Sequence, residues 1–538
     1  MGRVRRNAWL WGGWLFFLGV LFVPSIWILD QTIGEELGRL ILGGSEVGLP
    51  SRRELGLFGR SVALGLGASL VAGALGTMTG YLTARVAFAG RRLLFALLLL
   101  PFFVPAYCYA TAWVVLLAPG TVPISADPSP APVYSLKAAI LILAGCLFPW
   151  VHLVAAVGFA SIERHSEDAA RLTLSNIRRV THVVLPLVVG VIAPAWLFVF
   201  VLGLKNQSIA ELLRQHVFAT EILIDYQDFL DDRAAALKGL AFVAVSLGAL
   251  ALALGCALRR RRLAIEGLSL PLQPGEVSAR GLSVAGPLVG AAILTFAVIV
   301  PLAVLIRTAG PWANYRLVWE TAHDQIRTGF LTAAATATLS VTLGFVLAEF
   351  IEGSPGPLKA LTAALVFVLF ALPAPVLDIG LIQFWNRPGP LGWVYDRPIL
   401  LVLGQTGTFL PIAVLGFWVA LRRIDPRLIE AAELAALPWP TVARRILWPI
   451  LRPWFVGLWT VVFVLALNDV EAAVLLASPG ADTLSVRIMT MLHYMPDSHV
   501  AALCVTQVAL TALAVGLVAA VVAAGRLGAR IRAPNSWP

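Results

Sequence analysis

Long apolar runs recur along the whole chain, and short polar segments separate them. A hydrocarbon layer of about 30 Å needs about 20 apolar residues per helix, and each run is close to that length. We therefore expect an all-α integral membrane protein, because only helices satisfy the backbone of such runs in lipid. Twelve spans are expected, over residues 9–29, 62–84, 93–117, 138–160, 183–204, 239–257, 285–306, 328–350, 360–384, 398–420, 449–468 and 501–524.

Composition agrees with this interpretation, since 59% of the 538 residues are hydrophobic and only 13% are charged. In a soluble protein a net charge of +10 would indicate nucleic acid as a partner. Here we attribute the charge to arginines at the cytoplasmic ends of the expected helices. With the N-terminus inside, the inner segments hold 25 of the 40 Lys and Arg residues. Positive charge favours the cytoplasmic side, so both termini are expected in the cytoplasm.

One polar, alanine-rich segment interrupts the apolar pattern between the tenth and eleventh spans. Asp425 is suited to cap a helix, Pro426 to occupy its first position, and Pro438 to end it. The segment predicts a short helix at about 426–437 on the cytoplasmic membrane surface. Its alanines let the backbone of another protein approach closely.

A second copy of this segment occurs 263 residues earlier, where Glu167 aligns with Glu430, Ala169 with Ala432 and Pro186 with Pro449. The spans that follow also align, 200–204 with 463–467. Each half has six spans, an even number, so the halves are expected to be parallel repeats about an axis along the membrane normal. We expect a first repeat at 1–257, a cytoplasmic linker at 258–284, a second repeat at 285–538, and the first surface helix at about 162–175.

The duplicated segment resembles the signature loop of the permease subunits of binding-protein-dependent ABC importers. That loop has the pattern Glu-Ala-Ala, three residues, Gly, nine residues, Ile, one residue, Leu, Pro. The second copy matches at Glu430, Ala431, Ala432, Ile446 and Pro449, with Ala436 in place of Gly. The first matches at Glu167, Ala169 and Pro186, with Asp168 in place of Ala and Thr173 in place of Gly. The two copies are therefore expected to be unequal, the second being the stronger.

The resemblance implies two fused permease domains of the type I importer fold in a bacterial inner membrane. Both surface helices would be coupling helices for an ABC ATPase present in two copies, and a periplasmic binding protein would deliver the solute. The chain has no G-x-x-x-x-G-K-[ST] loop, so we expect a transport subunit, not an enzyme. We expect no cofactor on this chain, with ATP and Mg²⁺ on the partner ATPase. Lipid surrounds the spans, and nucleic acid is not expected as a partner.

Overall resemblance is greatest to the ferric iron group and next to thiamine permeases, and residues 483–488 add to the similarity with the iron group. Ferric iron is therefore the expected solute, while thiamine, phosphonate, a polyamine or an oxyanion remain alternatives. A different class, an ion-coupled secondary transporter, would also use repeats and would carry its coupling ion on Asp378.

Several polar residues in or beside the spans are candidates for a pathway or gate, because ionisable groups in hydrocarbon are costly. Asp378 follows a proline-rich break in the ninth span, and the alternative for it is an interhelical hydrogen bond. The eleventh span closes with Asn468, Asp469 and Glu471, and the equivalent place in the first half holds Lys205 and Asn206. The alternative for these five is that they only mark span ends. No metal site is expected. The histidines have no spaced partner, and the aspartates of loop 205–238, which a hard metal ion could use as ligands, are typical of a translocated loop.

Overall fold

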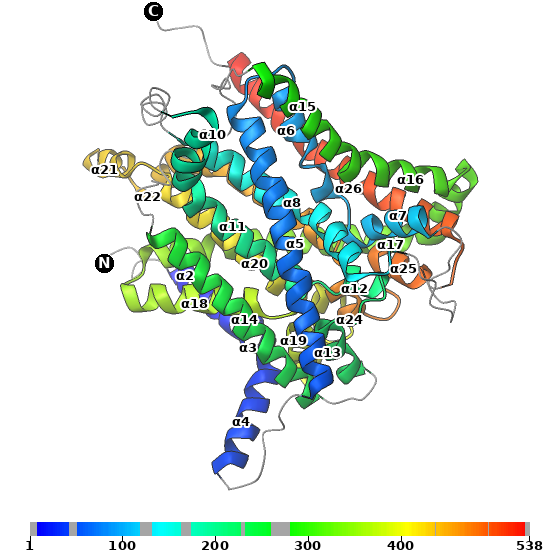
Figure 1. Ribbon diagram of the computed structural model, residues 1–538. Coiled ribbons are helices and arrows are strands. Elements are labelled where there is room, and N and C mark those ends of the chain that lie inside the picture. The colour runs from blue at the N-terminus through cyan, green and yellow to red at the C-terminus, as the bar shows by residue number, and fades with distance from the viewer. Residues whose placement is uncertain are drawn as a thin grey trace, which may run out of the picture.

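The computed structural model describes residues 8–41, 51–118, 132–162, 174–227, 232–259, 280–435, 437–492 and 494–532. These residues form helices joined by short connections, without a β-strand, so the predicted all-α fold class is confirmed (Figure 1). For description, the first half is taken as residues 8–259 and the second half as residues 280–532.

The first half contains α2 (Ala8–Phe16), η1 (Phe17–Phe22), α3 (Val23–Ser25), α4 (Trp27–Ile41), α5 (Arg52–Arg85), α6 (Arg91–Leu97), η2 (Leu100–Phe103), α7 (Ala106–Leu117), α8 (Leu136–Ala160), α10 (Asn176–Arg179), η3 (Val180–Val184), α11 (Leu185–Lys205), α12 (Ser208–Leu212), α13 (Phe218–Gln227) and α14 (Asp232–Arg259).

The second half contains α15 (Arg280–Leu294), η5 (Thr295–Ile299), α16 (Val300–Ala309), α17 (Trp312–Gly353), α18 (Gly356–Ala371), α19 (Ala374–Trp385), η6 (Pro390–Trp393), α20 (Pro398–Arg422), α21 (Pro426–Leu434), α22 (Trp439–Val442), η7 (Ala443–Leu447), α23 (Trp448–Leu467), α24 (Glu471–Leu476), α25 (Leu484–Met491) and α26 (Asp497–Arg532).

Ten of the expected spans are continuous apolar stretches in the described residues, and the other two are bent pairs of helices. The third span bends by 92° between η2 and α7, and the ninth by 106° between α18 and α19. Both were expected as single spans; only the ninth was expected to be interrupted. The cause is proline: Pro105 and Pro373 have extended backbone and no N–H, so the helical hydrogen bonds cannot continue through them.

Each half is built on three tightly packed helices, α5, α8 and α11 in the first and α17, α20 and α23 in the second. Small residues allow the backbones to approach closely. A Cβ on Gly76 would lie 2.7 Å from the backbone nitrogen of His152, and one on Gly344 would lie 2.6 Å from Ala413 Cβ. Close packing over small residues is the usual way in which helices associate in lipid.

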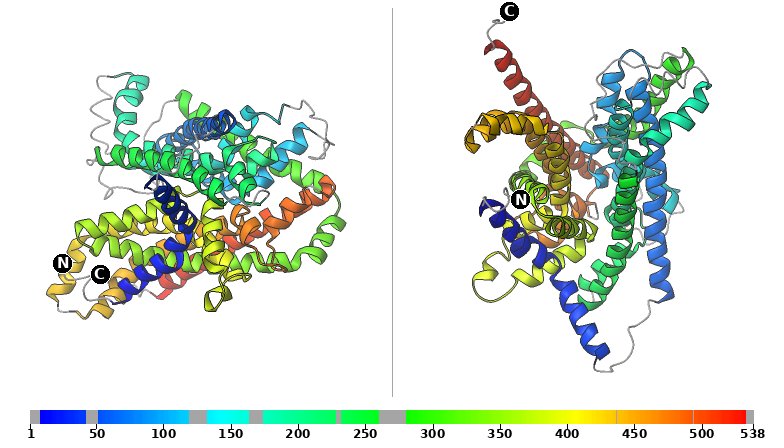
Figure 2. Two further views of the ribbon diagram at one scale, coloured as in Figure 1. Left: turned by 90° about the horizontal axis from the view of Figure 1, so that it is seen from below. Right: turned by 90° about the vertical axis from the view of Figure 1, so that its left-hand side faces the viewer.

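The first span of each half packs on the opposite half, as the position of dark-blue α2 in Figure 2 (right) makes visible. Helix α2 lies on α17, and Trp14 Nε1 donates a hydrogen bond of 3.1 Å to Thr362 Oγ1 of α18. In return, α15 lies on α5 and α6, where Gly290 faces the side chain of Leu94. The two halves are therefore interlocked at their edges.

Candidate functional site

The two halves meet at a partly buried hydrogen-bonded contact between α12 and α24. Glu471 Oε1 accepts hydrogen bonds from Ser208 Oγ at 3.1 Å and from the backbone N–H of Gln207 at 3.3 Å. Ser208 and Glu471 are 263 residues apart, the same offset that aligns the two sequence copies. Two equivalent residues can touch only near the axis that relates them, so this contact lies at the axis expected between the halves.

The same local structure precedes the contact in both halves. After α11, Asn206 Oδ1 accepts the N–H of Ile209 at 3.1 Å; after α23, Asp469 Oδ1 accepts the N–H of Glu471 at 3.2 Å. Short polar side chains are favoured at helix starts because they satisfy N–H groups without a helical partner. Asn206 and Asp469 are also 263 residues apart, so equivalent side chains accept an N–H at the starts of α12 and α24, from the third residue on in the first half and from the second residue on in the second half.

Lys205 connects this contact to the bent ninth span. Its Nζ donates to the carbonyls of Phe370 at 2.6 Å and of Leu372 at 3.2 Å, and it lies 4.7 Å from the centre of the Phe370 ring. Both carbonyls lie at the break before Pro373, where the helical pattern of hydrogen bonds stops. The ammonium group of Lys205 therefore donates its hydrogen bonds to backbone carbonyls of the second half.

The end of α23 is held by polar side chains from three neighbouring helices, all of them missed by the sequence analysis. Gln507 Nε2 donates to Leu467 O at 2.9 Å and to Asn468 Oδ1 at 3.0 Å. Gln405 Nε2 donates to Ala466 O at 2.9 Å, and Ser485 Oγ to Leu467 O at 3.1 Å. The sequence did contain a signal for two of these residues. Gln405 and Gln507 each lie inside an apolar span, where polar side chains are rare.

Asp378 is fully buried, and neither of its carboxylate oxygens has a hydrogen-bond partner among the described residues. It lies on α19 against Gly404 of α20, where a Cβ would come within 2.9 Å of Asp378 Oδ1. Asp469 and Glu471 are close enough to interact with it electrostatically. The interhelical hydrogen bond, which was the alternative to a pathway role for Asp378, is therefore absent from the described residues.

The environment also changes the acidity of the two carboxylates that follow α23. Burial raises the pKa of Asp469 to about 7, and the neighbouring Glu471 contributes in the same direction. Burial also raises the pKa of Glu471, although the hydrogen bonds from Gln207 and Ser208 oppose the change. Near neutral pH the protonation state of Asp469 therefore responds to small changes in its surroundings.

The alanine-rich segment of the second half lies at the other end of the bundle, as Figure 1 shows for α21 and α22 relative to α12 and α24. It forms α21, and Asp425 Oδ1 accepts the N–H of Arg427 at 2.9 Å at its start. Glu430 is exposed and Ala431 is exposed, whereas Ala432 is buried. Ala436 lies outside the described residues.

The two motif positions after α21 lie at the start of the next span. Ile446 belongs to η7, and Pro449 is the second residue of α23. In the first half Pro186 has the corresponding place in α11, but Glu167, Ala169 and Thr173 lie outside the described residues. The first coupling helix expected at about 162–175 therefore stays a prediction.

A groove of about 440 Å³ separates α21 from the end of α17 and the end of α20 that lie beside it. Glu430 lines it together with Glu349 and Glu352, and Arg422 Nε lies 2.8 Å from Glu352 Oε1. The acidic side chains outnumber the basic ones along this groove. The expected site residues that the structure describes thus form two groups, one at the axis and one around α21. Helix α23 runs from one group to the other.

Two acidic residues of loop 205–238, Glu221 and Asp225, form ion pairs with basic residues. Lys238 Nζ lies 2.6 Å from Asp225 Oδ2 and 3.3 Å from Glu54 Oε1, and Arg53 pairs with Glu221 at 2.6 Å. No group of three or more His, Cys, Asp or Glu residues suited to a metal ion occurs among the described residues.

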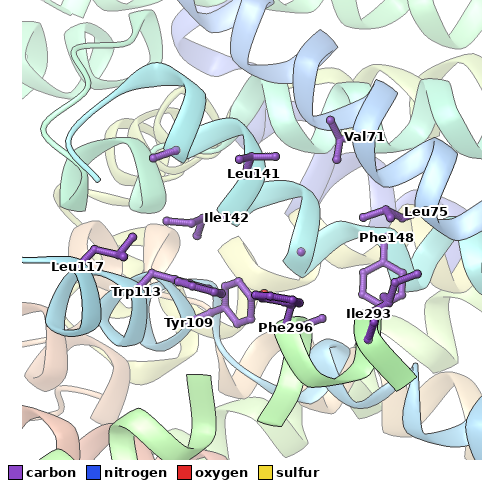
Figure 3. A pocket seen from close by; sticks show the side chains of 14 residues that line it. Val71, Leu75, Tyr109, Trp113, Leu117, Leu141, Ile142, Phe148, Ile293 and Phe296 are labelled. Carbon is purple, nitrogen blue, oxygen red and sulfur yellow. The ribbon is translucent and has the colours of Figure 1, made fainter. Parts of the chain in front are cut away.

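A cavity of about 440 Å³ between α5, α7, α8 and η5 is lined by apolar and aromatic side chains (Figure 3). Leu75, Ile142, Phe148 and Phe296 point into it, and Tyr109 is its one hydroxyl-bearing residue. The lining residues include no charged group, so the cavity offers no charged partner for an ionic solute.

No protein-family model matches the chain. It is 32% identical over 158 residues to a protein of Marchantia polymorpha described as the probable sulfate transport system permease protein cysT. The match covers 28% of this chain and 54% of that protein, so the chain spans about half the length of the curated relative that it matches. The chain is thus similar in part to a permease of a sulfate transport system, and its apolar helices support a multi-pass membrane protein.

Proposed function

We propose that the chain is the transmembrane permease of an ABC importer in a bacterial inner membrane, with both termini in the cytoplasm. A periplasmic binding protein delivers the solute, and two copies of a separate ATPase subunit bind the coupling helices on the inner side. ATP and Mg²⁺ belong to that ATPase, and this chain contributes no catalytic residue. Transport proceeds by alternating access between the halves.

The observation that carries this proposal is the contact of Ser208 with Glu471 between the two halves. It closes the axis at one end of α23, while the exposed helix α21 lies beyond the other end. An importer needs this separation, because ATP is used on the inner side and the solute enters on the outer side. In this proposal, the contact of Ser208 with Glu471 is the closed outer gate.

In the proposed cycle, ATP binding draws the two coupling helices together and turns the spans that follow them. The contacts of Glu471 with Gln207 and Ser208 then separate, and the solute passes from the binding protein into the space between the halves. The acidic groove beside Glu430 suits a basic side chain of the ATPase, because opposite charges across an interface orient the partners.

For the solute we propose ferric iron, with thiamine or a polyamine as the next candidates. The axis carries the carboxyl groups of Asp469 and Glu471, with Asp378 nearby, whereas Lys205 is occupied by backbone carbonyls. Two like charges 4 Å apart repel by about 4 kcal/mol at an effective dielectric constant of about 20. This charge distribution favours a cation over phosphonate or an oxyanion such as the sulfate named for the similar protein.

The decisive experiment combines affinity purification with uptake in cells that depend on this chain. An ATPase with a Walker motif should co-purify with it, and loss of Glu430 and Glu167 together should abolish uptake of radiolabelled ferric iron. Glu320→Ala is the matched control, because Glu320 is exposed and pairs only with Arg316 at 2.8 Å. Unchanged uptake in the double variant would refute the coupling role of the two segments.

One observation favours a second candidate, a carrier driven by an ion gradient. The unpartnered carboxyl group of Asp378 would be the place where a coupling proton or Na⁺ binds. Such a carrier would transport without an ATPase subunit and would stop when the ion gradient is dissipated. Uptake in vesicles that contain this chain alone separates the two candidates.

A further inference from the structure

Four turns of π-helix occur in the described residues, and each has the same construction. They are η1, η3, η5 and η7, and the N–H of the residue after each turn bonds to a carbonyl five residues back. These bonds run from Val23 to Leu18, from Leu185 to Val180, from Val300 to Thr295 and from Trp448 to Ala443. The next residue is always a proline: Pro24, Pro186, Pro301 or Pro449.

Proline explains why a turn widens but not where the widened turns occur. It lacks an N–H and its ring clashes with the carbonyl four residues back, so the preceding turn relaxes outward. However, five other prolines lie inside α-helices, and the turn directly before each of them is not a π turn: Pro149, Pro194, Pro287, Pro411 and Pro453. The widened turns therefore mark particular places in the fold.

Two of these places are equivalent in the two halves. The turn η3 at Val180–Val184 and the turn η7 at Ala443–Leu447 are 263 residues apart, as are Pro186 and Pro449. Both turns join a cytoplasmic segment to the span that ends at the axis. Helix α23 has 20 residues and is therefore about 30 Å long, and α11 is of similar length.

Both connecting helices end on groups that hold the gate closed. Helix α11 ends at Lys205, which bonds to the break in the ninth span, and leads directly to Ser208. Helix α23 ends at Leu467, which Gln507 and Ser485 hold, and leads directly to Glu471. A rotation of either helix about its cytoplasmic end therefore displaces one side of the contact at the axis.

We propose that Pro186 and Pro449 are positioning residues that keep η3 and η7 as flexible joints between the coupling segments and the gate. The proposal rests on the importer function given above and adds the route by which ATPase movement reaches Ser208 and Glu471. A wide turn next to a proline bends more easily than a continuous α-helix, because one backbone hydrogen bond is already missing. Without the joint, α23 could not pivot relative to α21 while α21 stays bound to the ATPase.

The test replaces one proline and leaves another in the same helix as control. Pro449→Ala restores the missing N–H and should convert η7 to α-helix, whereas Pro453→Ala changes a proline with no π turn directly before it. Hydrogen exchange on the purified full-length chain should slow at residues 443–448 in the first variant only. Pro186→Ala, with Pro194→Ala as its control, tests the equivalent joint and replaces the first pair if Pro449→Ala fails to fold.

The functional readout is solute transported per ATP hydrolysed by the complex with its ATPase in lipid vesicles. Pro449→Ala should lower this ratio about tenfold, a typical size for coupling between two sites, while ATP hydrolysis continues. Pro453→Ala should leave the ratio unchanged. Slower exchange with an unchanged ratio would overturn the proposal and leave the importer function intact. Failure of every variant and the parent chain to bind an ATPase would instead overturn the importer function and this proposal with it.

Discussion

Removing the carboxylate of Glu471 should open the outer gate, and the size of the effect follows from the contacts at the axis. Glu471→Ala leaves the buried N–H of Gln207 without its acceptor, whereas the Ser208 hydroxyl can rotate to another acceptor. An unsatisfied buried donor costs about 1–3 kcal/mol. The fraction of molecules with an open gate should therefore rise about 5- to 150-fold.

Glu471→Gln is the matched variant, because its amide oxygen accepts the same hydrogen bonds without the charge. If hydrogen bonding holds the gate, Glu471→Gln should remain closed while Glu471→Ala opens. If charge holds it, both variants should open equally.

Two native cysteines provide the assay. Cys108 and Cys504 are fully buried beside Tyr107, which interacts electrostatically with Asp469. In a chain without Cys146 and Cys256, alkylation by a water-soluble maleimide should be slow, and Glu471→Ala should accelerate it by the factor given above. An alkylation rate equal to that of the parent chain would refute the assignment of this contact as the closed gate.

Three further predictions concern pH, packing and the inequality of the halves. Burial raises the pKa of Asp469 to about 7, so ionisation of this carboxyl group is less favourable in the folded chain than in the unfolded chain. Thermal stability should therefore fall as pH rises from about 4 to above 7. In a series of melting curves, Asp469→Asn should remove this part of the fall. Gly404→Ala should destabilise the chain by about 1–3 kcal/mol through a clash with α24, whereas Gly516→Ala, in open space, should not; denaturation in detergent compares them. Glu430→Ala should reduce uptake more than Glu167→Ala, because the first copy already departs from the motif, and equal losses would contradict this.

The twelve spans were predictable because a bilayer demands long apolar runs whatever the tertiary structure. Hydropathy fixes neither the ends of helices nor their bends. Helix α5 begins at Arg52 instead of residue 62, since Ser51 and Glu54 form a capping box, and α17 begins at Trp312 instead of residue 328. The Ser51 and Glu54 spacing was present in the sequence, but a polar helical extension beyond the bilayer does not alter the apolar pattern.

The candidate site was predictable in part, for a related reason. The five polar residues at the ends of the fifth and eleventh spans come together at one place, and Asp378 lies close by. Their partners were not predictable, because Gln405 and Gln507 reach the end of α23 from helices far away in sequence. Only the packing of the spans decides which carbonyls a buried glutamine meets.

The exchange of first spans between the halves has a consequence for how the chain is made. Trp14 bonds to Thr362, which is 348 residues further along. At about 5–20 residues per second, a ribosome needs roughly 20–70 s to synthesise that interval. Helix α2 therefore waits among lipids until α18 has been synthesised. Its aromatic face, with Trp9, Trp11 and Trp14, must be stable in that waiting position as well as in the finished bundle.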